Sequence, residues 1–179
     1  MTGRERHLDR LRQLTVFAML GVIMFVSDIL MEFLPNVHIV GVLTVVYTIA
    51  YRWKALVPIY IYVLLNGLFS GFGIWWLAYL YVWSVLWGVA MLIPRGLGRR
   101  AKLVLYTTVC TLHGLCFGLL YVPVQMIYNS DIKYIISWLT VGFITTDIYH
   151  GIGNCIFGIL LIIPLSELLI KLENKMKID

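Results

Sequence analysis

Charged side chains are scarce in this sequence. Asp, Glu, Lys and Arg make up 13% of its 179 residues, whereas hydrophobic residues make up 61%. A soluble domain of this length carries about twice that share of charge, so water cannot be the solvent for most of the surface. We therefore expect an integral membrane protein. The hydrophobic stretches follow one another so closely that no second domain fits between them, which predicts a single domain.

Cysteines are few, and the usual catalytic motifs are missing. Cys110, Cys116 and Cys155 lack CxxC spacing, which argues against both a disulfide framework and a zinc site. The sequence has no GxSxG, HExxH or Walker-type glycine pattern and no paired-glutamate pattern of membrane proteases. The connections between apolar stretches are also too short for an ATPase domain. These absences favour binding or transport over catalysis, and nothing in the sequence predicts a resident cofactor or metal.

Long apolar stretches are what the sequence has in abundance. A helix needs roughly 20 apolar residues to cross the hydrocarbon core of a bilayer. The sequence therefore predicts an all-α bundle of six transmembrane helices, at residues 14–34, 37–53, 55–72, 74–93, 103–122 and 147–170. Residues 134–144 are too short to span, so we expect a short membrane-surface helix before the last span. The basic segment Arg4–Arg12 precedes a stretch too long for a signal peptide, which predicts a retained first helix.

The positions of lysine and arginine predict the orientation, because cytoplasmic loops are enriched in these residues. If the first segment is cytoplasmic, thirteen of the fourteen basic residues lie on that side and only Lys133 lies outside. Both termini are then cytoplasmic, and a different number of spans would break this partition. The net charge of +5 is thereby assigned to topology and anionic lipid, and not to nucleic acid.

Three polar residues share one face of the predicted last helix. Asp147, His150 and Asn154 are spaced i, i+3 and i+7, which places them on the same side. Polar groups inside the membrane are costly and face protein or a water-filled cavity. We therefore interpret all three as candidate substrate-binding residues.

Other polar residues leave two interpretations open. His113, alone in the fifth span, is either a ligand contact or a histidine bonded within the core, and we include it among the candidate substrate-binding residues. Asp28 and Glu32 lie one turn apart in the outer half of the first span. They are either functional, or they approach the outer headgroups and bond Asn36 and His38 in the loop that follows.

Aromatic residues are concentrated in the fourth span. Trp76, Tyr79 and Trp83 fall on one face, in a stripe that continues to Trp87. Interfacial belts explain shallow Trp and Tyr residues, whereas a deep stripe either packs the bundle or lines a flat pocket. We take Trp76, Tyr79 and Trp83, with Tyr121 of the fifth span, as candidate substrate-binding residues.

The charges in the outer half predict the chemistry of the ligand. This half holds Asp28, Glu32, Asp131 and Asp147 against Lys133 alone. A strongly anionic ligand would find no arginine there. Neutral or cationic aromatic ligands fit better, because rings stack on Trp and Tyr and a cation gains roughly 0.5–2 kcal/mol from their faces.

Three stretches of the sequence resemble a known family. Residues 33–68 run from FLPNVHIVGV to VLLNGL, residues 113–123 read HGLCFGLLYVP, and residues 145–154 read TTDIYHGIGN. With the size and the predicted helices, they resemble the S components, the substrate-binding membrane subunits, of energy-coupling factor (ECF) vitamin transporters. The resemblance implies capture of a vitamin or similar small nutrient on the extracellular side for ATP-driven uptake, in the plasma membrane of a bacterium.

The resemblance also implies partners. An S component works with a transmembrane scaffold (T) subunit and two ATPase subunits, so the chain itself is not expected to be an enzyme. The family docks through small residues on the first helix, often as AxxxA, and Ala18 and Gly21 stand at matching positions with a different, i, i+3 spacing. Two other classes stay open. One is a membrane enzyme or redox protein that uses Asp147, His150 and His113, and the other is a small envelope scaffold protein.

Overall fold

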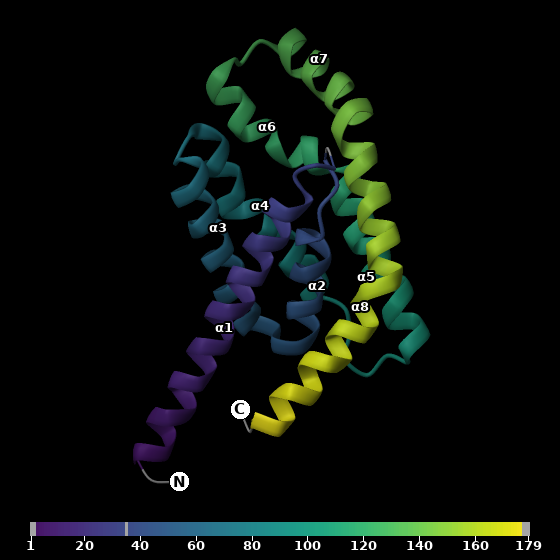
Figure 1. The fold of residues 1–179 in the computed structure, drawn as a ribbon. Helices are drawn as coiled ribbons and strands as arrows, with labels where there is room; N and C mark the ends of the chain where they lie inside the picture. The colour runs from purple at the N-terminus through teal and green to yellow at the C-terminus, as the bar shows by residue number, and fades with distance from the viewer. Residues whose placement is uncertain (1–2, 35, 177–179) are drawn as a thin grey trace.

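The structure is a computed structural model that describes residues 3–34 and 36–176 (Figure 1). The described residues form helices joined by short connections and contain no strand, which confirms the predicted all-α class. The elements are α1 (Gly3–Met31), α2 (Val40–Tyr51), the 3-10 turn η1 (Arg52–Ala55), α3 (Leu56–Ser70), α4 (Ile74–Met91), α5 (Arg99–Leu115), α6 (Phe117–Tyr128), α7 (Ile132–Gly142), the π-helical turn η2 (Phe143–Asp147) and α8 (Ile148–Met176).

Within the described residues, five helical segments are long and apolar enough to cross a membrane. Such segments are typical of a membrane protein. They are His7–Met31, Val40–Ser70, Ile74–Met91, Arg99–Tyr128 and Ile132–Lys175. The predicted second and third spans fall within one of these segments, so the count of six transmembrane helices stays a prediction.

The segment Val40–Ser70 is not one straight helix. Arg52 has φ 53° and ψ −120°, which no α-helical residue adopts, and η1 begins there. Figure 1 shows that the chain reverses at this point, so that α2 and α3 run in opposite directions. α2 has 12 residues and is about 18 Å long. It is shorter than the predicted span 37–53 because residues 37–39 precede the helix and residues 52–53 belong to the turn.

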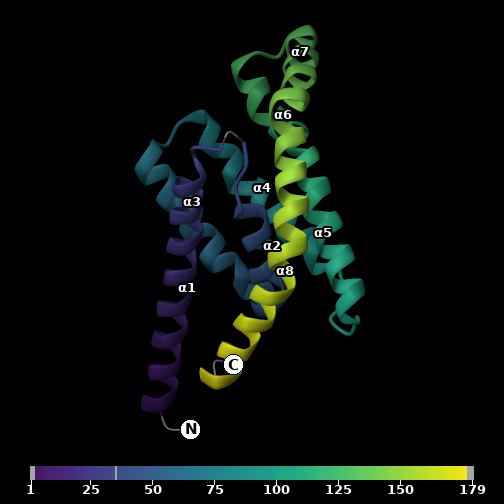
Figure 2. The ribbon, with the colours of Figure 1, turned by 45° about the vertical axis from the view of Figure 1, so that its right-hand side comes forward.

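The two ends of the bundle differ in what they hold. In both views, α1 begins and α8 ends at the same end (Figures 1 and 2). We call this the terminal end, and it also holds η1 and the α4–α5 connection. The opposite end holds the α1–α2 and α3–α4 connections, and we call it the distal end.

The predicted span 103–122 bends at Cys116. This residue has φ −100° and ψ 8° and separates α5 from α6. The amide of Gly118 donates to Asp147 Oδ1 over 3.0 Å instead of continuing the hydrogen-bond ladder of α5. α6 therefore leaves the line of α5 and forms a hairpin with α7 that projects beyond α3 and α4 at the distal end (Figure 2).

The predicted surface helix at residues 134–144 is present but is not separate from the last helix. α7 continues through η2 into α8 without a break. The predicted segments left residues 145–146 between the surface helix and the last span, but these residues lie within the π-helical turn. The Ile148 amide donates to Phe143 O, and the Thr145 hydroxyl donates to Val141 O over 2.9 Å. A hydroxyl bonded to the carbonyl four residues earlier allows the helix to continue.

α2 lies at the centre of the bundle, and its residues 40–48 are all buried. It packs against α1, α4, α5 and α8. α5 and α8 form the most extensive helix pair and approach closely at Gly114, where a Cβ atom would lie 2.8 Å from the carbonyl oxygen of His150. Small residues let membrane helices approach closely, and this close approach increases their van der Waals packing. Such packing stabilises helix pairs in lipid, where the hydrophobic effect does not drive helices together.

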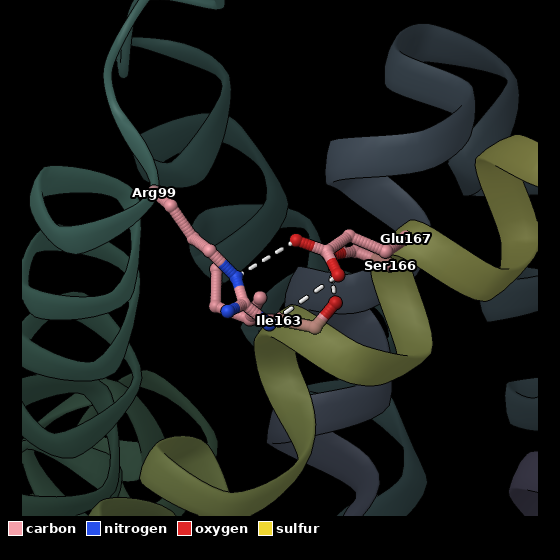
Figure 3. Close-up of polar contacts among 4 residues, drawn as sticks. All are labelled: Arg99, Ile163, Ser166 and Glu167. Carbon is pink, nitrogen blue, oxygen red and sulfur yellow. Dashed lines mark hydrogen bonds and ion pairs between the residues drawn. The ribbon is translucent and has the colours of Figure 1, made fainter.

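α5 and α8 also meet at the terminal end through an ion pair (Figure 3). Arg99 Nε donates to Glu167 Oε1 over 3.0 Å, and Nη2 donates to Oε2 over 3.4 Å. Beside it, the Ser166 hydroxyl donates to Ile163 O over 3.0 Å. The two charged side chains are 72% and 57% exposed, so their pair contributes about 0–1 kcal/mol. Side-chain packing therefore contributes most of the free energy that stabilises the contact between α5 and α8.

Candidate functional site

A cavity of about 350 Å³ lies at the distal end of the bundle. Its volume falls in the range of small-molecule sites. α1, α3, α4, α6, η2, α8 and the α1–α2 connection all contribute to its wall. We call it the distal cavity. Its polar and ring-bearing wall residues are Asp28, Glu32, Asn36, His38, Asn66, Ser70, Tyr79, Phe117, Thr146 and His150, with Phe25 and Phe69 beside them.

The Asp28 carboxylate is held in place by α3. Tyr62 Oη donates to Asp28 Oδ2 over 2.8 Å, and Asn66 Nδ2 donates to the same oxygen over 3.1 Å. Oδ1 accepts no hydrogen bond from the described residues, so it is available to a ligand. Tyr79 stacks on Tyr62 with the ring centroids 6.3 Å apart. The wall therefore presents one oriented carboxylate beside the ring of Tyr79, and Tyr62 lies buried behind them.

Three histidines gather at the base of this cavity, and we call them, with Trp83 and Phe117, the imidazole cluster; His38, Phe117 and His150 line the cavity itself. The His38 and His150 ring centroids are 4.8 Å apart, and His150 lies 4.7 Å from Phe117. Trp83 lies 5.9 Å from His38 and 5.8 Å from His113. The cluster therefore joins α4, α5, α6, α8 and the α1–α2 connection below the cavity.

The imidazoles differ in their hydrogen bonding. His113 Nε2 lies 3.1 Å from Val82 O, so it carries the proton and donates. His38 Nδ1 and His150 Nδ1 are buried without a partner among the described residues. Burial lowers the pKa of the His38 imidazole to about 4, and His113 adds to that lowering. His38 is therefore neutral at pH 7, and each unpaired nitrogen can bond a ligand or water.

The charges around the distal cavity are of one sign. Asp28 and Glu32 line it, and no lysine or arginine does among the described residues. An unpaired anionic ligand would therefore meet repulsion and desolvation without a compensating cation. The chemistry of the wall suits a flat ligand that is neutral or positive, with N–H groups for the carboxylates and a ring for Tyr79 and Phe117.

Four of the eight predicted substrate-binding residues line a cavity. Tyr79 and His150 line the distal cavity. Tyr121 and Asp147 line a second cavity of about 490 Å³ between α6 and α7, which we call the lateral cavity. Phe117 and Thr146 belong to both walls, so only side chains of these elements separate the two spaces.

Asp147 and Tyr121 also have evident structural roles. Asp147 accepts from the Gly118 amide in the first turn of α6, where an N-terminal carboxylate satisfies a free amide and favours the helix. Tyr121 Oη donates to Trp75 O over 3.1 Å and so ties α6 to α4. Both residues hold the α6–α7 hairpin in place at the rim of the lateral cavity.

The other four predicted residues lie outside both cavities. Trp76 Nε1 donates to Val63 O over 2.8 Å and joins α4 to α3. Asn154 Nδ2 donates to Cys110 O over 3.0 Å and joins α8 to α5. Trp83 is 1% exposed and, with His113, forms the floor of the imidazole cluster beneath the distal cavity. These four residues pack behind the residues that line the distal cavity and support them.

Several wall residues were missed or left open by the sequence analysis. Asp28 bonds Tyr62 and Asn66 on α3, and not the loop residues considered as its partners. Asn66 carried a usable signal, because it is an amide within an apolar span. Phe117 carried none, since nothing in the sequence distinguishes it from a packing residue. Asn36 donates to Thr145 O over 3.1 Å and closes the α1–α2 connection against η2.

The two predicted docking residues lie on different sides of α1. Gly21 is buried against α3, and a Cβ atom there would lie 3.0 Å from Pro58 O and closer still to Ile61. Ala18 is exposed, in a stripe with Met19, Val22 and Val26. Of the pair, only Ala18 is available to another subunit in the structure.

Comparisons with known proteins do not assign the chain to a family. No family model matches it, and searches of curated proteins and of solved structures return no match. The helical, apolar architecture and the geometry of the distal cavity are therefore the basis for any statement about function.

Proposed function

We propose that the chain is the S component of an energy-coupling factor importer and captures a small aromatic nutrient in the distal cavity. The observation that carries this proposal is the cavity itself. It has the volume of a small-molecule site, an oriented carboxylate at Asp28 and unpaired imidazole nitrogens at His38 and His150. The cavity also lies at the distal end. Arg52, Arg95 and other basic residues lie at the terminal end, on the opposite side of the bundle.

The proposal includes six transmembrane helices, α1 to α5 and α8, with both termini in the cytoplasm. α2 is short for a span, but its residues 40–48 are buried by neighbouring helices. A helix shielded from lipid does not need to match the thickness of the hydrocarbon core, since its backbone bonds are satisfied and protein surrounds it. The positive terminal end then faces the cytoplasm, as the distribution of lysine and arginine requires.

The proposed substrate is neutral or cationic and contains a ring. Asp28 and Glu32 favour a positive or N–H-bearing group, and Tyr79 and Phe117 supply faces for stacking. The neutral imidazole of His38 accepts or donates one hydrogen bond, according to its tautomer. A vitamin-like heterocycle with amide or amine groups has this combination.

We propose that partner subunits, and not this chain alone, move the substrate across the membrane. The chain binds alone, and a scaffold subunit with two ATPases supplies the energy for uptake. Ala18 and its exposed neighbours on α1 are the proposed contact with the scaffold.

The test of this proposal begins with the molecules that co-purify. The protein is purified in mild detergent and denatured, and mass spectrometry identifies what is released. We expect one small ring-containing compound, whose affinity is then measured by calorimetry. Asp28→Asn should weaken that affinity about tenfold or more, equal to roughly 1.4 kcal/mol.

Asp131→Asn is the matched control, because it removes an acidic charge at the same end outside the distal cavity. Asp131 caps α7 through the Lys133 amide, and asparagine retains that cap. Equal affinities for both variants and the wild type would contradict the placement of the site. Release of haem or a metal would favour the membrane enzyme or redox protein instead.

A further inference from the structure

A third cavity, of about 370 Å³, lies at the terminal end, far from the proposed substrate site. Residues of α2, η1, the α4–α5 connection, α5 and α8 form it, and we call it the terminal cavity. Three basic side chains from three different elements meet in its wall with one carboxylate. The charged and polar wall residues are Arg52, Arg95, Lys102, Tyr106 and Glu173.

Arg52 is held firmly in this wall. Its Nη2 donates to Met91 O over 2.7 Å, and its backbone carbonyl accepts from Trp87 Nε1 over 3.0 Å. Its Nη1 is buried and finds no hydrogen-bond partner in the described chain. Arginine is fully charged at neutral pH, so Nη1 is a positively charged donor, and the hydroxyl of Tyr106 is the polar group that interacts with this guanidinium from α5.

The backbone of Arg52 is strained. Its φ of 53° and ψ of −120° lie in a region that glycine adopts freely and a residue with a Cβ atom rarely does. Backbone strain of this kind persists where the surrounding structure or a function demands it. The bond to Met91 O uses Nη2, and the strained position places the Arg52 side chain in the wall of the terminal cavity, with its buried Nη1 unpaired.

We propose that the terminal cavity binds a phosphate-bearing anion through Arg52, Arg95 and Lys102. A guanidinium and an ammonium from separate elements match the several acceptor oxygens of one phosphate group. Glu173 offsets one of the three positive charges, and the wall stays positive. Apolar Ile49, Ala50 and Ile170 also line the cavity, so an attached acyl or carbon chain finds contact there. The anion is the headgroup of an acidic phospholipid or a free phosphate compound.

The lipid arm of the test uses the full chain in detergent, titrated with phosphatidylglycerol or phosphatidylcholine, and native mass spectrometry counts the bound lipid. We expect retention of phosphatidylglycerol and not of phosphatidylcholine. The double variant R95Q/K102Q should weaken retention of phosphatidylglycerol at least tenfold. R100Q/K171Q removes the same charge from exposed positions at the same end and should change retention less than twofold.

The phosphate arm measures thermal unfolding with inorganic phosphate against sodium chloride of equal ionic strength. Stabilisation of the wild type by phosphate, absent in R95Q/K102Q, indicates a site for free phosphate compounds. Binding of phosphatidylglycerol without a phosphate effect indicates a lipid headgroup. Equal losses in both double variants, equal retention of both lipids, or no binding in either arm would overturn the proposal.

Arg52 has its own test, which separates folding from binding. Arg52→Gly places glycine where φ is positive and removes the side chain, so relief of strain offsets loss of the bond to Met91 O. We expect a melting temperature close to that of the wild type and at least a tenfold loss of anion affinity. Unchanged affinity in a folded Arg52→Gly protein would show that Arg52 serves the turn alone.

Discussion

Tyr62 on α3 donates a 2.8 Å hydrogen bond to the carboxylate of Asp28 on α1. The same bond packs two helices together and fixes one wall of the distal cavity. Tyr62 is fully buried, and its ring also lies edge-on to Trp83 at 6.0 Å. The orientation of Asp28 therefore depends on the aromatic layer behind the cavity as well as on its own helix.

Tyr62→Phe should weaken ligand binding while the protein stays folded. It removes the hydroxyl and keeps the ring, so Asp28 retains only the bond from Asn66 and becomes less well oriented. We expect a loss of about three- to tenfold in affinity, because one hydrogen bond to a charged group contributes about 1.5–3 kcal/mol when made and reorientation recovers part of it. Calorimetry measures the loss. Tyr60→Phe, on an exposed face of the same helix, is the control and should bind normally.

Gly114→Ala should destabilise the protein, whereas Gly88→Ala should not. At Gly114 a Cβ atom would lie 2.8 Å from the His150 backbone, which cannot move aside as a side chain would. We expect a loss of about 1–3 kcal/mol from such overpacking. At Gly88, within α4, a Cβ atom meets nothing within 4 Å, and alanine favours a helix by roughly 0.5–1 kcal/mol. Thermal unfolding in detergent compares the two, and equal stabilities would contradict the close contact of α5 and α8.

Acid should destabilise the fold through His38. Its pKa is about 4 in the folded chain and near 6.5 when unfolded, so folding favours the neutral form. The stabilisation is complete above about pH 6.5 and is lost as the pH falls toward 4, by up to roughly 3 kcal/mol. His113 and His150 face His38 from α5 and α8 and remain in the variant tested. The melting temperature should therefore fall less between pH 7 and pH 5 in the His38→Gln variant than in the wild type.

His7→Gln is the control for that measurement, because His7 is exposed on α1. Its melting temperature should follow that of the wild type at every pH. The same acid dependence in wild type and His38→Gln would place the pH-sensitive group elsewhere.

The sequence predicted the helical class because apolar length and composition are local properties. It also predicted that His150 and Asn154 are helical, whereas Asp147 lies in the π-helical turn η2 just before α8. It could not show that Asp147 bonds the Gly118 amide 29 residues earlier, which is what bends α5 into α6. Nor could it show that Asp28 turns toward α3, because that depends on which helices become neighbours.

The same limit explains the docking pair and the surface helix. The family resemblance put Ala18 and Gly21 together, but the contact of α1 with α3 buries Gly21 and leaves Ala18 exposed. The predicted surface helix ended at residue 144 and the predicted last span began at residue 147. Only the pattern of backbone bonds in η2 shows that the helix continues between them. Arg52 has no sequence signal for its positive φ, since arginine is not a residue that favours it.

Enlarging Ala18 should uncouple uptake from binding. Leucine at this exposed position has room on the isolated chain but would obstruct a close contact with a scaffold subunit. In cells that carry the partner subunits, Ala18→Leu should reduce uptake tenfold or more and leave the affinity of the purified chain unchanged. Ala101→Leu, exposed on α5, is the control and should transport normally. Full uptake with Ala18→Leu would place the docking face on another helix.

Labelling of single cysteines should establish the number of spans. In a background with Cys110, Cys116 and Cys155 replaced by alanine, Ser70→Cys and Ser130→Cys at the distal end should react with an impermeant thiol reagent in intact cells. Gly96→Cys and Lys54→Cys at the terminal end should react only after the cells are opened, because six spans and cytoplasmic termini place them inside. The turn at η1 decides the count. If α2 and α3 formed one span, Lys54 would lie within the membrane and stay unreactive in both conditions, and Ser70 and Gly96 could not both keep their assigned sides.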